Sequence, residues 1–338
     1  MTAKQRIEAF IALGNKIEAC SDQELDDLFR RAENNNSWFT PEQVNMAIKG
    51  IRELLLEKPL LQWANRYSLP DGFRGLKIGV LMAGNIPGVG FHDLMMVLLA
   101  GYQAHVKLSS NDQVVIKWLV AQLRELAPEL ADRVFFEEML KAKDAYIATG
   151  SDNSARYFEY YFGKYPSIIR KNRTSVAVLN GQETSEDYLA LAGDVFQYFG
   201  LGCRNVSKVY LKSEQQIKDF YDAIEAYQLI TSQHKYLNNY DYNKSIYLVN
   251  GEPHLDNGFL LTKNSSDLVS PVAVLYYEIY EEAEQLKALL SEQESKIQCV
   301  VSKDAWFEGS LAFGEAQCPG VEDYADHVDT MAFLLGLK

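Results

Sequence analysis

The sequence predicts an α/β protein with two domains built on mainly parallel sheets. From about residue 76 to residue 301, short apolar runs rich in β-branched residues alternate with longer segments of helical periodicity. Strand-then-helix units in succession imply parallel sheets. A chain of 338 residues also corresponds to roughly two domains of ~150 residues each. We therefore expect two α/β domains that share an extensive interface, with the active site in the cleft between them.

Composition and charge exclude several classes of protein. Hydrophobic residues make up 47% of the chain and charged residues 23%, as in ordinary folded proteins. The net charge of -13 argues against a nucleic-acid or anionic-membrane surface. The longest apolar run, 94–100, is far below the ~18 residues of a spanning helix, and the N-terminus has no signal-peptide pattern. We expect no nucleic acid partner and no stable membrane insertion.

The four cysteines, Cys20, Cys203, Cys299 and Cys318, are widely separated and form no C-x-x-C pair. This spacing suggests neither a disulfide framework nor a zinc site. We therefore expect a reducing cytoplasm and no metal. Cys299 and Cys318 are interpreted as packing residues.

Residues 1 to about 66 are expected to form helices with no chemistry of their own. Thr40 is the expected N-cap of one of them, with Pro41 at its first position. The next segment, 76–83, is an expected strand, and it is followed by a glycine-rich turn at 84–90 and a helix at 91–99. These are the parts of a mononucleotide-binding unit, although the glycines match neither G-x-G-x-x-G nor the phosphate-binding loop.

Two further strand-then-helix units follow. A strand at 104–108 leads into an expected N-cap region at 109–112 and a helix through residues 115–123. A strand at 145–149 leads into a turn at 150–154 and another helix. Ligands of parallel sheets bind at the carboxyl ends of the strands, and the residues at those ends are Asn85, Lys107, Gly150 and Ser151.

A second α/β domain is expected from about residue 180 to 310. The expected strands are 173–179, which precedes it, and 208–211, 245–249, 259–261, 271–277 and 297–301; the expected helices are 184–199, 214–226 and 281–291. Cys203 follows the first of these helices, on a turn between Gly200, Gly202 and Arg204. The glycines let a substrate approach closely, and Arg204 would lower the thiol pKa. An inert buried cysteine is the favoured alternative when these residues are taken alone.

Five segments in this order resemble the aldehyde dehydrogenase superfamily, and within it the acyl-CoA reductase family typified by the fatty-acid reductase of bacterial luminescence. They are 83–87, 106–110, 149–151, 202–203 and 270–272, and the resemblance covers about residues 76 to 335. It implies a cofactor-binding domain over 1–179, including the N-terminal helical segment. It also implies a catalytic domain over 180–310 and a segment, 311–338, that returns to the cofactor domain.

The resemblance also implies roles for single residues. Cys203 matches the family's catalytic thiol, and Asn85 matches the amide that helps to form its oxyanion hole. Lys107 matches the lysine on the adenosine ribose, and Gly150 and Ser151 match the turn against the cofactor pyrophosphate.

Three other positions bear on the cofactor and the reaction. Asp267 sits where aldehyde-oxidising relatives carry a glutamate on the nicotinamide ribose. Ser110 replaces a glutamate typical of NAD-selective relatives, which favours NADPH, with NADH as the alternative. Oxidising relatives also keep a water-activating glutamate near the stretch 168–174, where this chain has no acidic residue. A Cys203 thioester would therefore resist hydrolysis.

The implied function is NAD(P)H-dependent reduction of an acyl-CoA, with a fatty acyl-CoA favoured, to the aldehyde through a Cys203 thioester. The sequence leaves open whether the chain forms a homo-oligomer and whether an acyl-transfer protein supplies the substrate. The alternatives are an aldehyde dehydrogenase, an acyl-phosphate reductase, or a catalytically silent nucleotide-binding or acyl-carrying partner. His327 is a candidate proton donor, with a surface or structural role favoured. The aromatic segments 157–162 and 198–199 would line an acyl tunnel, with helix packing the favoured alternative.

Overall fold

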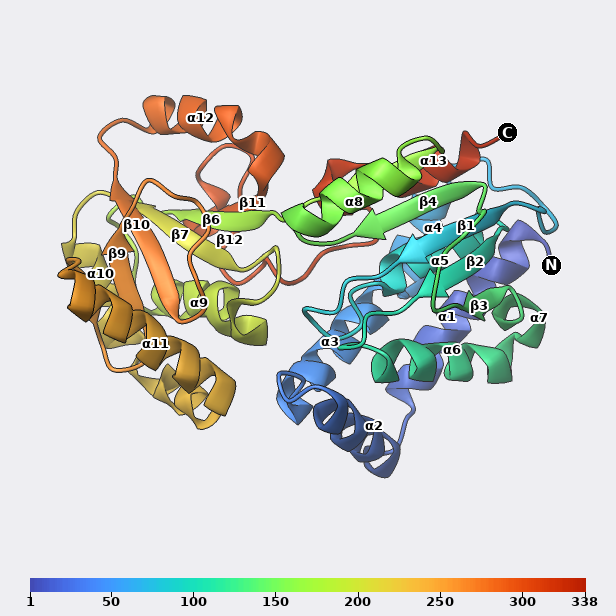
Figure 1. Cartoon of the computed structure of the whole chain (residues 1–338), viewed down its shortest axis with the longest axis horizontal. Helices are drawn as coiled ribbons and strands as arrows, with labels where there is room; N and C mark the ends of the chain where they lie inside the picture. The colour runs from blue at the N-terminus through green and yellow to red at the C-terminus, as the bar shows by residue number, and fades with distance from the viewer. The chain divides into compact units, whose positions relative to one another are not determined.

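The computed structural model describes residues 1–338 apart from the side chain of Asp152. Its internal contacts divide the chain into two compact units (Figure 1). The first unit contains Met1–Asn172 and Pro319–Lys338, and the second contains Arg173–Cys318. Strand β6 (Thr174–Val178), which the predicted domain bounds place before residue 180, pairs within the sheet of the second unit.

The first unit holds a five-stranded sheet in the order β3-β2-β1-β4-β5. Every neighbouring pair in it is parallel, which confirms the parallel sheet predicted from the strand-then-helix units. The strands are β1 (Lys77–Leu81), β2 (Gln103–Lys107), β3 (Val134–Phe136), β4 (Ala145–Thr149) and β5 (Ser167–Arg170). The chain runs outward from β1 to β3 and then restarts on the other side of β1, so the strand order reverses between β1 and β4.

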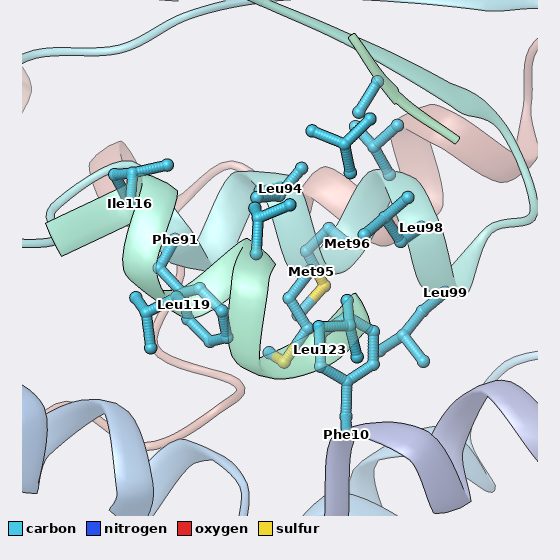
Figure 2. Close-up of a cluster of buried hydrophobic side chains, with 14 of the residues drawn as sticks. Phe10, Phe91, Leu94, Met95, Met96, Leu98, Leu99, Ile116, Leu119 and Leu123 are labelled. Carbon is cyan, nitrogen blue, oxygen red and sulfur yellow. The ribbon is translucent and has the colours of Figure 1, made fainter. Parts of the chain in front are cut away.

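Helices cover both faces of this sheet. In Figure 1, α5 (Phe91–Leu99) and α6 (Val114–Leu126) lie on one face and α8 (Asp152–Phe162) lies on the other, as right-handed crossovers require. Every residue of α5 except His92 is buried, because the helix is apolar apart from His92 and Asp93. Figure 2 shows its side chains clustered with Phe10 and with residues of α6, and the Phe10 and Phe91 rings meet edge to face with centroids 6.3 Å apart.

The helical N-terminal segment is confirmed. It contains α1 (Ala3–Glu18), α2 (Asp22–Asn35), α3 (Pro41–Leu54) and α4 (Glu57–Ala64), and the short α7 (Pro128–Ala131) lies further along the unit. Thr40 is the N-cap of α3 and Pro41 its first residue, as predicted. Arg6 is fully buried and donates to the backbone carbonyls of Leu99 and Pro70, among others. These bonds anchor α1 to the end of α5.

The second unit holds a seven-stranded sheet in the order β12-β11-β6-β7-β10-β9-β8. All pairs are parallel except β8 with β9. Besides β6, the strands are β7 (Val206–Leu211), β8 (Leu255–Asp256), β9 (Leu261–Asn264), β10 (Val274–Ile279), β11 (Ile297–Ser302) and β12 (Leu311–Ala312). In Figure 1, α9 (Ser185–Phe196), α10 (Gln215–Ala223) and α11 (His234–Asn250) lie on one face of this sheet, and α12 (Ala283–Glu292) lies on the other.

The predicted strand at 245–249 is wrong, because these residues form the last turns of α11. The run Ser245–Val249 is short, apolar and partly β-branched, and periodicity alone does not separate such a run from a strand. Along the whole segment the buried residues recur at helical spacing: Tyr236, Tyr240, Asn243 and Tyr247. Burial of this stripe favours a helix over a strand. The helix ends at Gly251, which adopts the left-handed conformation with φ 64°.

The C-terminal segment, 319–338, lies in the first unit. It carries α13 (Thr330–Leu335), whose Met331 and Leu334 are buried in the core of that unit. The hydroxyl of Tyr102 donates to the Leu334 carbonyl. The remaining short 3-10 helices are η1 (Gln197–Gly200), η2 (Glu225–Ser232), η3 (Glu294–Lys296), η4 (Lys303–Ala305) and η5 (Ala325–His327). Across the described residues, none of the helices has the length and apolar character to span a membrane.

Candidate active site

The carboxyl edge of the five-stranded sheet collects five of the predicted site residues. Lys107 is the last residue of β2 and lies opposite Leu81, the last residue of β1. The turn with Asn85 follows β1, the turn with Ser110 follows β2, and Gly150 with Ser151 follows β4. The turns after β1 and β4 flank the position where the strand order reverses, which is the usual ligand site of such a sheet.

The turn after β1 is fixed against the turn after β2. A Cβ atom on Gly84 would lie 2.4 Å from Ser109 Oγ, so only glycine permits this approach. The backbone N–H of Gly88, a residue with φ 71°, donates to Asp112 Oδ2 at 2.7 Å. Together these contacts hold the turn that carries Asn85.

Asp112 is buried beneath this turn. Burial raises the pKa of its carboxyl group to about 7, although the bond from Gly88 acts in the opposite direction. Its Oδ1 atom has no hydrogen-bond partner among the described residues. The predicted capping role of residues 109–112 is wrong, because the N-cap of α6 is Gln113, which makes no side-chain cap bond. Asp112 binds the glycine turn instead.

The N-terminal helices also support the turn after β2. The side-chain amide of Asn35, the last residue of α2, donates to the carbonyls of Ser110 and Asn111 at 3.1 and 3.2 Å. The Ser110 side chain itself is exposed. The helical segment, predicted to have no chemistry, therefore fixes the backbone beside a predicted cofactor residue.

The turn after β4 leads directly into α8. Ser151 is the N-cap, and its hydroxyl accepts from the Ser154 N–H. A Cβ on Gly150 would lie 2.8 Å from the Phe158 ring, so this glycine packs tightly on its own helix. The start of an 11-residue helix places partial positive charge beside this turn, which suits a phosphate group.

The aromatic residues of α8 divide into two sets. Phe162 stacks on Tyr146 with ring centroids 4.2 Å apart, as the packing alternative predicts. Tyr157, Tyr160 and Tyr161 are 67%, 79% and 59% exposed, so packing does not account for these three.

In the second unit, the backbone before Cys203 is strained. Tyr198, Phe199 and Gly200 have φ angles of 52°, 57° and 76°, so three consecutive residues are left-handed. Glycine tolerates this conformation, whereas a bulky side chain there costs ~1–3 kcal/mol. Such strain often marks a functional turn. The half-buried Cys203 follows three residues after this run.

Asn205 ties the Cys203 turn to the end of α9. Its side chain is 2% exposed. Its Oδ1 atom accepts from the Gly202 N–H at 2.7 Å, and its Nδ2 atom donates to the carbonyls of Asp194 and Gln197 at 3.0 and 2.8 Å. The residues on either side of Cys203 are therefore linked by one buried amide, a role that the sequence did not reveal.

A buried carboxylate holds a second segment near this turn. Asp194 is fully buried and accepts from the N–H groups of Gly314 and Ala316 at 2.7 and 3.1 Å. Burial raises the pKa of Asp194 to about 6, against the effect of these two bonds. Arg204 donates to the Ala316 carbonyl at 3.4 Å. Its predicted influence on the Cys203 thiol stays a prediction.

A second thiol lies beside the Cys203 turn. The hydroxyl of Ser175, in β6, donates to the Cys203 carbonyl at 3.1 Å and lies 3.0 Å from Cys299 Sγ, in β11. Burial raises the pKa of the Cys299 thiol. Cys299 is therefore a poor nucleophile, which agrees with its interpretation as a packing residue.

Asp267 lies at the same edge of the seven-stranded sheet as Cys203. Its neighbour Leu268 accepts, through its carbonyl, from the Ser207 hydroxyl at 2.6 Å, and Ser207 is the second residue of β7. Asp267 is exposed. A cavity of about 30 Å³ is lined by Phe199, Gly200, Pro271 and other residues of this unit; it has room for about two water molecules.

His327 lines a polar cavity of about 320 Å³ within the first unit. The other lining residues are Arg66, Tyr67, Glu322, Asp323, Tyr324 and Asp329. His327 is exposed, and its role as a proton donor stays a prediction. The roles of the other predicted site residues also stay predictions, as does the predicted active-site cleft between the domains. No cluster of three potential metal ligands occurs among the residues that the structure describes.

This architecture is similar to that of known proteins. A model of the family described as Acyl-CoA reductase (LuxC) matches residues 50–245. A search of curated proteins found no match. The chain is similar to aldehyde dehydrogenase 21 from Physcomitrella patens, in complex with the product succinate, with 9% identity, a TM-score of 0.67, and 99% of this chain and 84% of that chain covered.

Two further solved structures are similar. An aldehyde dehydrogenase from Mycobacterium tuberculosis, complexed with NAD+, shares 12% identity at a TM-score of 0.63, with 89% of this chain and 73% of that chain covered. The NAD+ complex of an aldehyde dehydrogenase from Bacillus cereus shares 12% identity at a TM-score of 0.59, with 89% and 72% covered. These likenesses confirm the predicted aldehyde-dehydrogenase-like fold.

Proposed function

We propose that this chain, which belongs to the acyl-CoA reductase family of the aldehyde dehydrogenase superfamily, reduces an acyl-CoA to the aldehyde through a thioester on Cys203. Membership assigns the chain to an oxidoreductase family. The observation that carries the finer proposal is the Cys203 turn, because a strained backbone and a buried amide fix the main chain on which this thiol is carried. In this proposal the first unit binds the cofactor and the second carries the nucleophile.

Cys203 would act first. Its thiolate attacks the thioester carbonyl of the acyl-CoA, forms a new C–S bond and releases coenzyme A as a thiol after protonation. The Cys203 N–H and the Asn85 amide would stabilise the oxyanion. In the second stage the acyl carbonyl gains a hydride, the bond to Cys203 breaks and the aldehyde leaves, so that the thiolate is restored.

The lack of a carboxylate in the stretch 168–174 supports reduction over hydrolysis. Oxidising relatives carry a water-activating glutamate near this stretch, whereas its one buried charged side chain here, Arg170, is 3% exposed and paired with Asp93 at 2.5 Å. A guanidinium group stays protonated and cannot take a proton from water. The Cys203 thioester would therefore persist long enough for reduction.

The residues at the carboxyl edge of the five-stranded sheet fit a nicotinamide dinucleotide. Lys107 is exposed at the end of β2, and Gly150 and Ser151 begin α8, whose N-terminus suits the pyrophosphate. The small neutral Ser110 favours NADPH, and Asp267 would contact the nicotinamide ribose. When bound, the reduced nicotinamide would supply the hydride.

The proposal is tested by measuring NAD(P)H oxidation with an acyl-CoA and with an acyl phosphate, and NAD(P)+ reduction with an aldehyde plus coenzyme A in the reverse direction. We expect turnover with the acyl-CoA and none for Cys203→Ser. Cys299→Ser is the matched control, because it removes the neighbouring thiol, and it should retain turnover. No turnover with any thioester would refute the proposal, and activity with acyl phosphate alone would favour an acyl-phosphate reductase.

We also propose where the enzyme acts and what supplies its acyl group. The four free cysteines agree with a cytoplasmic enzyme, which would act on a fatty acyl-CoA or receive its acyl group from a transfer protein. Size-exclusion chromatography with light scattering would show whether it forms a homo-oligomer.

A further inference from the structure

One buried side chain, Arg170, joins the elements at the carboxyl edge of the five-stranded sheet. It is the last residue of β5 and is 3% exposed. Its Nη1 atom donates to Asp93 Oδ2 at 2.5 Å, and its Nη2 atom donates to Thr330 Oγ1 at 2.9 Å. Nη1 also lies 3.5 Å from Thr149 Oγ1, at the distance limit of a hydrogen bond.

Each partner of Arg170 lies next to a functional turn or on the C-terminal segment. Asp93 is in the first turn of α5, which begins directly after the glycine turn that carries Asn85. Thr149 ends β4 and immediately precedes Gly150 and Ser151. Thr330 is the first residue of α13. One guanidinium group therefore contacts the flanks of both turns at the position where the strand order reverses.

The C-terminal segment meets the start of α5 at a second point. A ring nitrogen of His92, the residue before Asp93, lies 2.9 Å from the Val321 carbonyl. The start of α5 is thus held by the C-terminal segment on one side and by β5 on the other. Because an arginine fork forms several directional bonds at once, a shorter or neutral side chain at 170 would leave Asp93 as a buried charge without its partner.

Resting on the proposed function, we propose that Arg170 is a positioning residue: its buried bonds to Asp93, Thr149 and Thr330 hold the Asn85 turn and the Gly150–Ser151 turn in register for oxyanion and cofactor binding. Arg170 touches neither substrate nor cofactor in this role. It acts through the two turns, whose displacement by about 1 Å is enough to reduce a rate by up to ~100-fold.

The test compares Arg170→Met and Arg170→Lys with Arg6→Met. Arg6 is a matched control, because it is also a buried arginine of the first unit and donates to the Leu99 carbonyl at the other end of α5. Two quantities are measured separately: the dissociation constant for NADPH, from the fluorescence of the bound reduced cofactor, and the rate of Cys203 acylation by acyl-CoA, from mass spectrometry. Neither requires turnover.

For Arg170→Met we expect both quantities to worsen by about tenfold or more. Arg170→Lys should recover part of the loss, because an ammonium group retains the bond to Asp93 but loses the fork. Arg6→Met should lower the unfolding midpoint and leave both quantities within about twofold of the wild type. Equal values for Arg170→Met and the wild type would overturn the inference, as would equal losses in Arg6→Met.

Two further variants keep the test decisive if Arg170→Met does not fold. Thr330→Val removes only the hydroxyl that accepts from Nη2, and Asp93→Asn keeps the shape of the carboxylate without its charge. Each is expected to weaken NADPH binding by about threefold or more, and an unchanged dissociation constant in both would overturn the inference. If the wild type bound no nicotinamide and formed no acyl adduct, the proposed function itself would fail, which is a distinct outcome.

Discussion

Replacing Asp112 by asparagine should change the pH dependence of stability in the first unit. The Asp112 carboxyl is buried, and its pKa is raised from 3.8 to about 7. The folded chain therefore binds this proton more tightly than the unfolded chain does. Stability from this group is fully present below about pH 4, falls as the pH rises toward 7 and is constant above that. A shift of about three pKa units corresponds to at most about 4 kcal/mol.

The amide introduced by Asp112→Asn would be neutral at every pH, and its oxygen can still accept from the Gly88 N–H. The free energy of unfolding of Asp112→Asn, relative to the wild type, should therefore increase by about 4 kcal/mol between about pH 4 and pH 8. Urea denaturation, followed by the tryptophan fluorescence that reports mainly on the first unit, measures this difference. A difference that stays constant within about 1 kcal/mol over the same range would refute the assignment of a raised pKa to Asp112.

Three other changes test the site. Asn205→Ala should destabilise the second unit by about 2–4 kcal/mol in urea denaturation, because it removes the partner of the Gly202 N–H and of three carbonyls; a cost below about 1 kcal/mol would contradict this. Asp194→Asn should remove a loss of stability between about pH 4 and pH 6, since burial raises that pKa to about 6, and parallel pH profiles would contradict it. Ser110→Glu should shift the kcat/KM ratio from NADPH toward NADH by about tenfold or more through repulsion of the 2′-phosphate, with Ser110→Ala as the neutral control and an unchanged ratio as the contrary result.

Strands of the first sheet were predictable because each one is marked by a hydrophobic pattern within a few consecutive residues. The strands β1, β2 and β4 are short apolar runs that end in polar or glycine-rich turns, and the structure places them within one or two residues of the predicted bounds. The turns that follow lie at one edge because parallel strands share a direction. The prediction for 245–249 failed for a related reason, since four consecutive apolar residues carry no periodicity that separates a strand from a helix.

The contacts that hold the site were not predictable because they join distant segments. Arg170 meets Asp93, which is 77 positions away in the chain, and Thr330, which is 160 positions away. Asn205 looked like an ordinary turn residue, although its side chain connects α9 to the Cys203 turn. Nor does the sequence announce the left-handed backbone of Tyr198, since aromatic residues rarely adopt it.

Cys203 as the acyl-carrying nucleophile is the central claim, and mass spectrometry of the protein mixed with an acyl-CoA tests it most directly. Without reduced cofactor, we predict a mass increase equal to one acyl group, located by peptide mapping on the peptide that contains Cys203. The adduct should be stable in water, because the stretch 168–174 has no acidic residue to activate a water molecule. Adding NADPH should remove the adduct and release the aldehyde. An adduct on Cys299 instead of Cys203, or no adduct with any acyl-CoA, would contradict the account.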